Sequence, residues 1–148
     1  MRGLTMRIYT IGFTKHTAEE FFEKLKSAGV RQVIDIRINK TSQLAAFAKS
    51  SDLPYLLNVI AGIRYMSYSE LAPTKELLKS YRSKKITWKE FEKQYKNQIK
   101  NSKAILGLNK IDFENACLLC SENTADKCHR RLLAEKLVQM WGVEIIHL

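Results

Sequence analysis

The stretch CLLCSENTADKCHRRLLAEKL (residues 117–137) changes character twice along its length. It begins as an apolar run that ends at Cys120, continues as a polar loop, and restarts near Cys128 as a helix. A short continuous apolar run is typical of a strand buried on both faces of a parallel sheet, where crossover helices cover it. The stretch therefore predicts one strand followed by one helix of an α/β fold.

The same alternation of strand and helix extends over the whole chain. Capping boxes at Thr17–Glu20 and Thr87–Glu90 mark the starts of two helices, and Gly142 marks the end of another. Strands are predicted at residues 7–12, 30–37, 63–68, 116–120 and 143–148; helices are predicted at 17–29, 54–62, 74–85, 87–103 and 128–141, with a loop containing one helical turn at 38–51. This order predicts a single α/β domain, residues 1–148, whose mainly parallel five-stranded sheet carries helices on both faces.

The composition limits the class of protein. The 148 residues are the usual length of one domain, and no run of eighteen or more apolar residues is present. The start, MRGLTMRIYT, has too short an apolar stretch for a signal peptide, so a cytoplasmic protein without a membrane partner is expected. Three cysteines cannot all pair, and disulfides are rare in a reducing compartment. Cys117, Cys120 and Cys128 are therefore expected to be free thiols, ligands or core residues.

Basic residues outnumber acidic ones and are concentrated in one region. The chain has 25 Lys and Arg against 15 Asp and Glu, a net charge of +10. Between Lys75 and Lys110 there are 11 basic and 3 acidic residues, which gives +8 in that region. A local field of this sign favours polyanions, so nucleic acid is a candidate partner.

Polar residues follow four of the predicted strands, at residues 12–15, 35–37, 68–70 and 120–122. Because parallel strands end at the same edge of a sheet, these residues are expected to gather where α/β proteins bind their ligands. Asp35 and Arg37 alternate along their strand and so lie on one face. They form either a structural ion pair or a pair that faces the substrate.

The residues from Cys120 to Arg130 are compatible with three kinds of site. A zinc site would use Cys120, Cys128 and His129, with Glu122 as a fourth candidate ligand. The pattern lacks a second ligand pair such as Cys-x2-Cys, so no metal is expected. A nucleophilic thiol is suggested by Cys120, because a helix N-terminus and nearby basic residues favour a thiolate. The alternative is that Cys120 and Cys128 are buried packing residues.

The third kind is an anion site, and it demands the least of the sequence. It requires only that the amides at the start of the helix near Cys128, with Arg130 and His129, meet a phosphate or carboxylate. Basic residues in a first helical turn oppose the helix dipole, and a bound anion would compensate them. We therefore expect Cys120 and Cys128 to be packing residues beside an anion site.

Several motifs together resemble the DUF488 family, small proteins named for having no assigned function. The motifs are TIGFT (10–14), IDIR (34–37), IRYMSYSELAPTKELL (63–78), LLCSE (118–122) and CHRRLLAEKL (128–137). The resemblance implies a compact α/β domain but no particular reaction. Its motif residues correspond to Gly12, Asp35, Arg37, Glu70, Cys120, Glu122, Cys128, His129 and Arg130. The family often has histidines where this chain has Phe13 and Ser67, so a mechanism that needs those imidazoles is not expected here.

Two classes of function are predicted, with a third behind them. The first is an enzyme acting on a phosphate-bearing substrate such as a nucleotide or nucleic acid. The second is a basic nucleic-acid-binding module without catalysis, and the third is a thiol redox or sulfur-handling protein. For the enzyme, no cofactor is predicted. Its predicted catalytic residues are Asp35, Glu70, Glu122 and His129, and its predicted binding residues are Gly12, Arg37, Cys120, Cys128 and Arg130.

Overall fold

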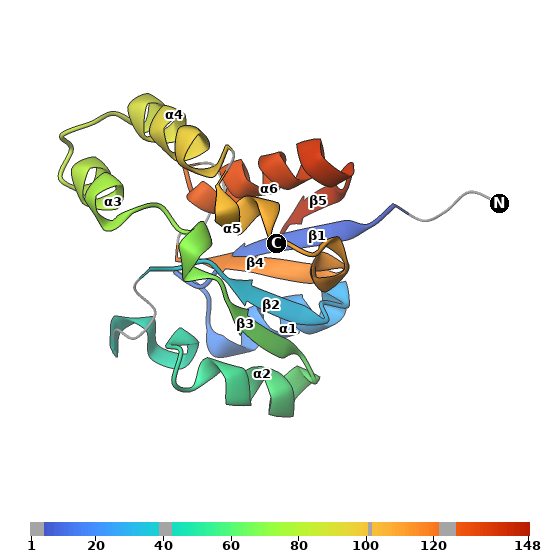
Figure 1. The fold of residues 1–148 in the computed structure, drawn as a ribbon. Coiled ribbons are helices and arrows are strands. Elements are labelled where there is room, and N and C mark those ends of the chain that lie inside the picture. The colour runs from blue at the N-terminus through green and yellow to red at the C-terminus, as the bar shows by residue number, and fades with distance from the viewer. Residues whose placement is uncertain (1–4, 39–42, 101, 122–126) are drawn as a thin grey trace.

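The computed structural model describes residues 5–38, 43–100, 102–121 and 127–148. In this part of the chain, five parallel strands form one sheet in the order β3-β2-β4-β1-β5 (Figure 1). The strands are β1 (Arg7–Gly12), β2 (Gln32–Asp35), β3 (Arg64–Ser67), β4 (Ala116–Cys120) and β5 (Glu144–His147). Every strand pairing is parallel, and the predicted single-domain α/β fold is confirmed.

Helices cover both faces of the sheet (Figure 1). On one face lie α1 (Ala18–Ala28) and α2 (Leu53–Ala61); on the other lie α3 (Lys75–Arg82), α4 (Trp88–Ile99), α5 (Lys103–Leu106) and α6 (His129–Trp141). Side chains of the central strand β4 alternate between the two cores. Cys117 and Leu119 belong to the core under α1 and α2, whereas Leu118 and Cys120 belong to the core under α3 to α6.

Local sequence signals explain most of the helix boundaries. The capping boxes at Thr17 and Thr87 form as predicted, and Gly142 ends α6 in a left-handed conformation with φ of 64°. Short elements had no periodic signal in the sequence: α5, and the 3-10 helices η2 (Ser69–Leu71) and η3 (Lys110–Phe113). A further 3-10 element, η1 (Gln43–Ala48), lies in the predicted loop. None of the helices in the described ranges is long and apolar enough to cross a membrane.

The carboxyl end of β4 is the point where the topology reverses. The chain leaves β1 and β2, the two neighbours of β4, toward α1 and α2 on one face. It leaves β4 itself toward α6 on the opposite face. Open α/β sheets bind ligands beyond such a reversal, because the diverging connections leave a crevice there. The end of β4 is therefore the place where a site is expected.

Candidate functional site

Asp35 and Arg37, at the carboxyl end of β2, form a buried bidentate ion pair. The guanidinium donates from Nε to Asp35 Oδ1 and from Nη2 to Oδ2, each at 2.8 Å. The Arg37 amide also donates to Oδ1 at 3.1 Å, and the Tyr65 hydroxyl donates to Oδ2 at 2.5 Å. Asp35 is 0% exposed and Arg37 is 2% exposed. Asp35 is fully engaged, and it holds Arg37 in position.

The rest of the Arg37 guanidinium is only partly satisfied. Nη2 also donates to the carbonyl of Ala48 at 2.6 Å, and the guanidinium carbon lies 5.3 Å from the centre of the Phe13 ring. Nη1 is buried and has no hydrogen-bond partner among the residues that the structure describes. A buried donor without a partner costs about 1–3 kcal/mol. A ligand oxygen at Nη1 would recover that cost.

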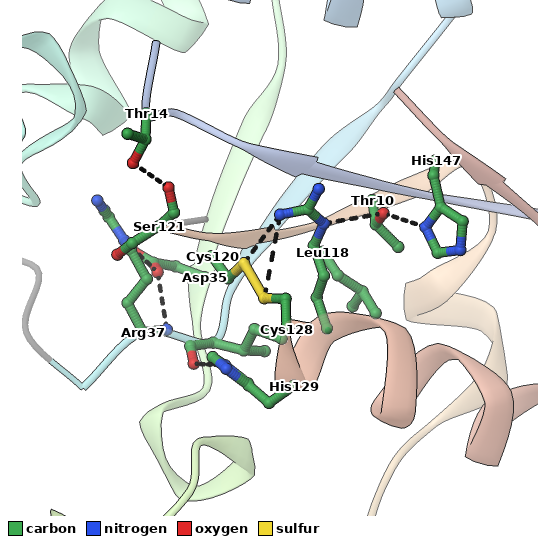
Figure 2. Close-up of a disulfide and its surroundings, with 12 residues drawn as sticks. Thr10, Thr14, Asp35, Arg37, Leu118, Cys120, Ser121, Cys128, His129 and His147 are labelled. Carbon is green, nitrogen blue, oxygen red and sulfur yellow. Dashed lines mark hydrogen bonds and ion pairs between the residues drawn. A yellow bond between two sulfur atoms is a disulfide. The ribbon is translucent and has the colours of Figure 1, made fainter. Parts of the chain in front are cut away.

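Cys120 ends β4, and Cys128 is the N-cap residue of α6. The structure joins their sulfurs in a disulfide (Figure 2). The cysteines were expected to be free thiols, ligands or core residues, with no disulfide. The predicted absence of a disulfide is wrong for this pair, because α6 folds back onto the sheet and brings the two side chains together. The two side chains are buried as expected, at 0% and 2% exposure. Cys117 remains free on the opposite face of β4, and burial raises the pKa of its thiol.

Arg130 lies directly beside the sulfur pair and is 1% exposed. Its Nη1 is 3.0 Å from the Cys120 sulfur and 4.0 Å from the Cys128 sulfur. Its Nε donates to Thr10 Oγ1 at 3.2 Å, and Thr10 Oγ1 lies 2.6 Å from His147 Nδ1 (Figure 2). Burial, followed by the charge of Arg130, lowers the pKa of His147. The neutral ring and Thr10 together fix the guanidinium against Cys120.

His129 is the first residue of α6 and is held as a neutral imidazole. Its Nε2 lies 3.0 Å from the carbonyl oxygen of Ile36. Because a carbonyl can only accept, Nε2 carries the proton and Nδ1 keeps a lone pair. Burial lowers the pKa of His129 to about 4, and the nearby charge of Arg130 acts in the same direction. At neutral pH, His129 is therefore a proton acceptor at Nδ1.

A pocket of about 70 Å³ lies between the sheet edge and the α3–α4 pair. The two sulfurs, His129 and Ser121 form part of its wall. Three cations, Arg37, Arg82 and Lys127, and three aromatic rings, Tyr81, Trp88 and Phe91, also line it. A buried water needs about 10–15 Å³, so the pocket has room for a compact group rather than for a large ligand.

The structure brings some of the predicted site residues together and separates others. Four of them line the pocket: Arg37, Cys120, Cys128 and His129. Arg130 contacts the Cys120 sulfur, and Gly12 of β1 is the strand partner of Cys120 in β4. Asp35 is buried behind Arg37. Glu70 is exposed in η2 and is not one of the described residues around the pocket. Glu122 lies outside the described residues.

Sequence reasoning did not find the outer wall of the pocket. Arg82 ends α3 and Trp88 begins α4, so neither follows a strand. Tyr65, which bonds to Asp35, has an apolar strand context that carries no functional signal. Within residues 5–38, 43–100, 102–121 and 127–148, no group of three or more His, Cys, Asp or Glu side chains is arranged to hold a metal ion.

A comparison with protein families places the chain. The model of the domain of unknown function DUF488 matches residues 17–137 of the 148. The chain belongs to the DUF488 family. The match covers β2 to β4 and most of α6, so every residue of the pocket wall lies within it, whereas β1 with Gly12 lies before it. No curated protein and no solved structure matches the chain.

Proposed function

We propose that this DUF488 protein is an enzyme acting on a substrate that carries a compact oxyanion, such as the phosphoryl group of a nucleotide or of a nucleic-acid end. The proposal rests on the guanidinium of Arg37, a residue that lines the pocket. Its Nη1 is a buried donor that has no hydrogen-bond partner among the described residues. An oxyanion satisfies both the charge and the hydrogen-bonding capacity of such a group.

The surroundings of Arg37 support the same ligand. Arg82 and Lys127 add positive charge to the wall. Cys128, the N-cap of α6, makes no side-chain capping bond, so the first amides of this 13-residue helix have no cap from it. Helix N-termini attract anions through these amides and through the helix dipole.

The pocket also contains a group that can move a proton. His129 is neutral at pH 7 and has a free lone pair at Nδ1, so it is the proton acceptor of the proposed site. The rings of Tyr81 and Trp88 give the pocket an apolar side, against which the part of the substrate next to the oxyanion can pack. Asp35 takes no part in proton transfer, because the ion pair with Arg37 occupies it.

Removing one wall cation tests the proposal. Calorimetric titration with AMP, adenosine and inorganic phosphate should show binding of AMP and phosphate, and much weaker binding of adenosine. In Arg82→Gln, the affinity for AMP should fall about 10- to 100-fold, because a charge-assisted contact is worth about 1.5–3 kcal/mol.

The matched control is Arg64→Gln, which removes the same charge at the start of β3, away from the pocket. It should leave AMP affinity within about twofold, because surface charges beyond a Debye length are screened. Equal losses in the two variants, or equal affinity for adenosine and AMP, would contradict the proposal. If His129→Gln still binds AMP but no longer turns over a phosphate-bearing substrate, the result would support His129 as the proton acceptor.

A second candidate function is nucleic-acid binding, and a specific groove favours it. The groove lies between α4 and α6 and is lined by Lys93, Lys96, Lys100 and Lys136. Lys96 pairs with Glu92, while Lys93 and Lys100 are exposed. Lysines at this spacing can contact successive phosphates of a nucleic-acid strand without reading its sequence.

Salt dependence tests the second candidate. Fluorescence anisotropy with labelled single-stranded DNA and RNA should show binding at 50 mM salt that weakens steeply toward 200 mM. Lys93→Gln with Lys100→Gln should weaken binding and reduce the slope of log K against log salt by about 1.4, because each phosphate contact on a single strand contributes about 0.7. The control, Lys24→Gln with Lys26→Gln on α1, removes the same charge from the opposite face. Absence of binding at 50 mM would rule this function out.

A further inference from the structure

We propose that Cys128 and Cys120 form a redox-active pair that exchanges electrons with an anionic low-molecular-weight disulfide or thiol entering the pocket. The activity goes beyond the proposed action on an oxyanion and does not depend on it. The two sulfurs are adjacent, and both cysteines line the pocket. They are eight positions apart in the sequence, but the fold gives them the adjacency that a Cys-x2-Cys motif provides locally.

The pair belongs to the core under α3 to α6, but it also lies at the border of the pocket. Both cysteines border the pocket at the carboxyl end of β4, whereas Cys117, three residues earlier, points into the other core. Both residues are buried, but Cys128 is the N-cap residue of α6, where the helix dipole favours a thiolate. We therefore assign Cys128 as the attacking thiol and Cys120 as the resolving thiol.

The electrostatics favour the thiolate form of both residues. Cys128 lies at the N-terminus of α6, where the helix dipole stabilises a negative charge. Cys120 has the buried guanidinium of Arg130 at 3.0 Å from its sulfur. Thr10, which accepts from Arg130 Nε, holds that guanidinium in place. A stabilised Cys120 thiolate is a good leaving group when an external thiol attacks the disulfide at Cys128.

The exchange balances in two steps. The Cys128 thiolate attacks one sulfur of a disulfide RSSR, breaking its S–S bond, forming a mixed disulfide and releasing one RS⁻. The Cys120 thiolate then attacks the Cys128 sulfur, forming the protein disulfide and releasing the second RS⁻. Two electrons pass from the cysteines to RSSR, and the two thiol protons pass through water to the released thiolates. The reverse sequence, with two RSH, reduces the protein.

The charge of the wall selects the partner. Arg37, Arg82 and Lys127 line the same pocket as the sulfurs. These positive charges attract a disulfide that carries carboxylate or phosphate groups and stabilise it in the pocket, whereas they repel a cationic disulfide. The preferred class is therefore an anionic disulfide small enough to present its sulfur in a narrow pocket.

Mixed-disulfide trapping tests the assignment of roles. Reduced Cys120→Ser, treated with 3,3′-dithiodipropionate, should form a stable adduct on Cys128 that peptide mapping by mass spectrometry locates. Reduced Cys128→Ser should react at least 10-fold more slowly. Reduced wild-type protein should release two equivalents of thiol and regain the Cys120–Cys128 disulfide, with Cys117 unmodified. The wild-type measurement needs no variant, so it remains decisive if a serine variant does not fold.

A charge series tests the class of partner. Rates with anionic dithiodipropionate, neutral hydroxyethyl disulfide and cationic cystamine are each divided by the rate with 2-mercaptoethanol, a neutral thiol, which removes their intrinsic reactivity. The normalised rates should fall in that order. Lys127→Gln should reduce the preference for the anion about threefold or more, whereas Lys26→Gln, which removes the same charge on α1 outside this pocket, should leave it unchanged.

Three results would overturn the proposal. In the first, reduced wild-type protein releases no thiol from any of the three disulfides. In the second, the adduct forms preferentially on Cys120 or Cys117. In the third, the normalised rates are equal across the charge series. A role of Arg130 in holding the thiolate has its own readout. In Thr10→Val, which loosens the anchor of Arg130, the pH profile of Cys120 alkylation should move to higher pH, whereas a purely structural change would alter the rate without moving the profile.

Discussion

Replacing Asp35 with alanine should lower the free energy of unfolding by about 3–5 kcal/mol, because it leaves the guanidinium of Arg37 buried without its carboxylate. Both side chains are almost fully excluded from solvent, and two charge-assisted bonds of 2.8 Å join them. The loss should appear in urea unfolding followed by circular dichroism, as a lower midpoint at an unchanged slope.

Two further variants separate the ion pair from its surroundings. Tyr65→Phe removes only the hydroxyl that donates to Asp35 Oδ2 and should cost about 1–3 kcal/mol. Asp35→Leu combined with Arg37→Met removes both charges and should recover much of the loss, as apolar replacements of buried pairs commonly do. A loss below about 1 kcal/mol in Asp35→Ala would mean that the pair does not restrain Arg37.

Acid should destabilise the fold through His129. Burial lowers the folded-state pKa of His129 from 6.5 to about 4, so between these values the unfolded chain binds more protons than the folded one. Stability therefore increases with pH across this window and is lost as the pH falls from 6.5 toward 4. At about 1.4 kcal/mol per pH unit, the contribution of His129 amounts to as much as about 3 kcal/mol.

The measurement compares unfolding free energies at pH 4 and pH 7 in wild type and His129→Gln. Glutamine does not titrate, so the variant should lose less stability in acid than wild type does. His147, whose pKa is also lowered, remains in both proteins and cancels from the comparison. An unchanged dependence in His129→Gln would mean that His129 titrates normally in the folded state.

The strands and the shared edge of the sheet follow from local patterns in the sequence. Apolar runs ended by polar residues locate the carboxyl ends of β2 and β4, and parallel order then brings Arg37 and Cys120 to one side. His129 lies at the same edge because it is the first residue of α6, and α6 begins where the chain returns to the carboxyl ends of the strands. These inferences need only the period of each element and the rule that parallel strands end together.

What escaped prediction depends on tertiary packing. Nothing local indicates that Cys120 and Cys128 touch, because the angle at which α6 returns to the sheet decides it. Likewise, Arg82 and Trp88 reach the pocket only because α3 and α4 pack as a pair beside the carboxyl ends of the strands. The sequence is equally compatible with a structural ion pair at Asp35 and with a catalytic residue that faces the substrate. The burial of Asp35, which the sequence does not reveal, favours the structural role.

The bonds that fix Arg130 have a consequence for the order in which the protein assembles. Thr10 and Arg130 are 120 positions apart, and Thr10 and His147 are 137 apart. Contacts between such distant segments close the longest loops and form late in folding. Among the described strands, β5 is an edge strand that pairs with β1 alone, and strands with few neighbours open locally at low energy. The surroundings of the Cys120 sulfur should therefore be completed last, and fraying of β5 should loosen them while the central strands stay intact.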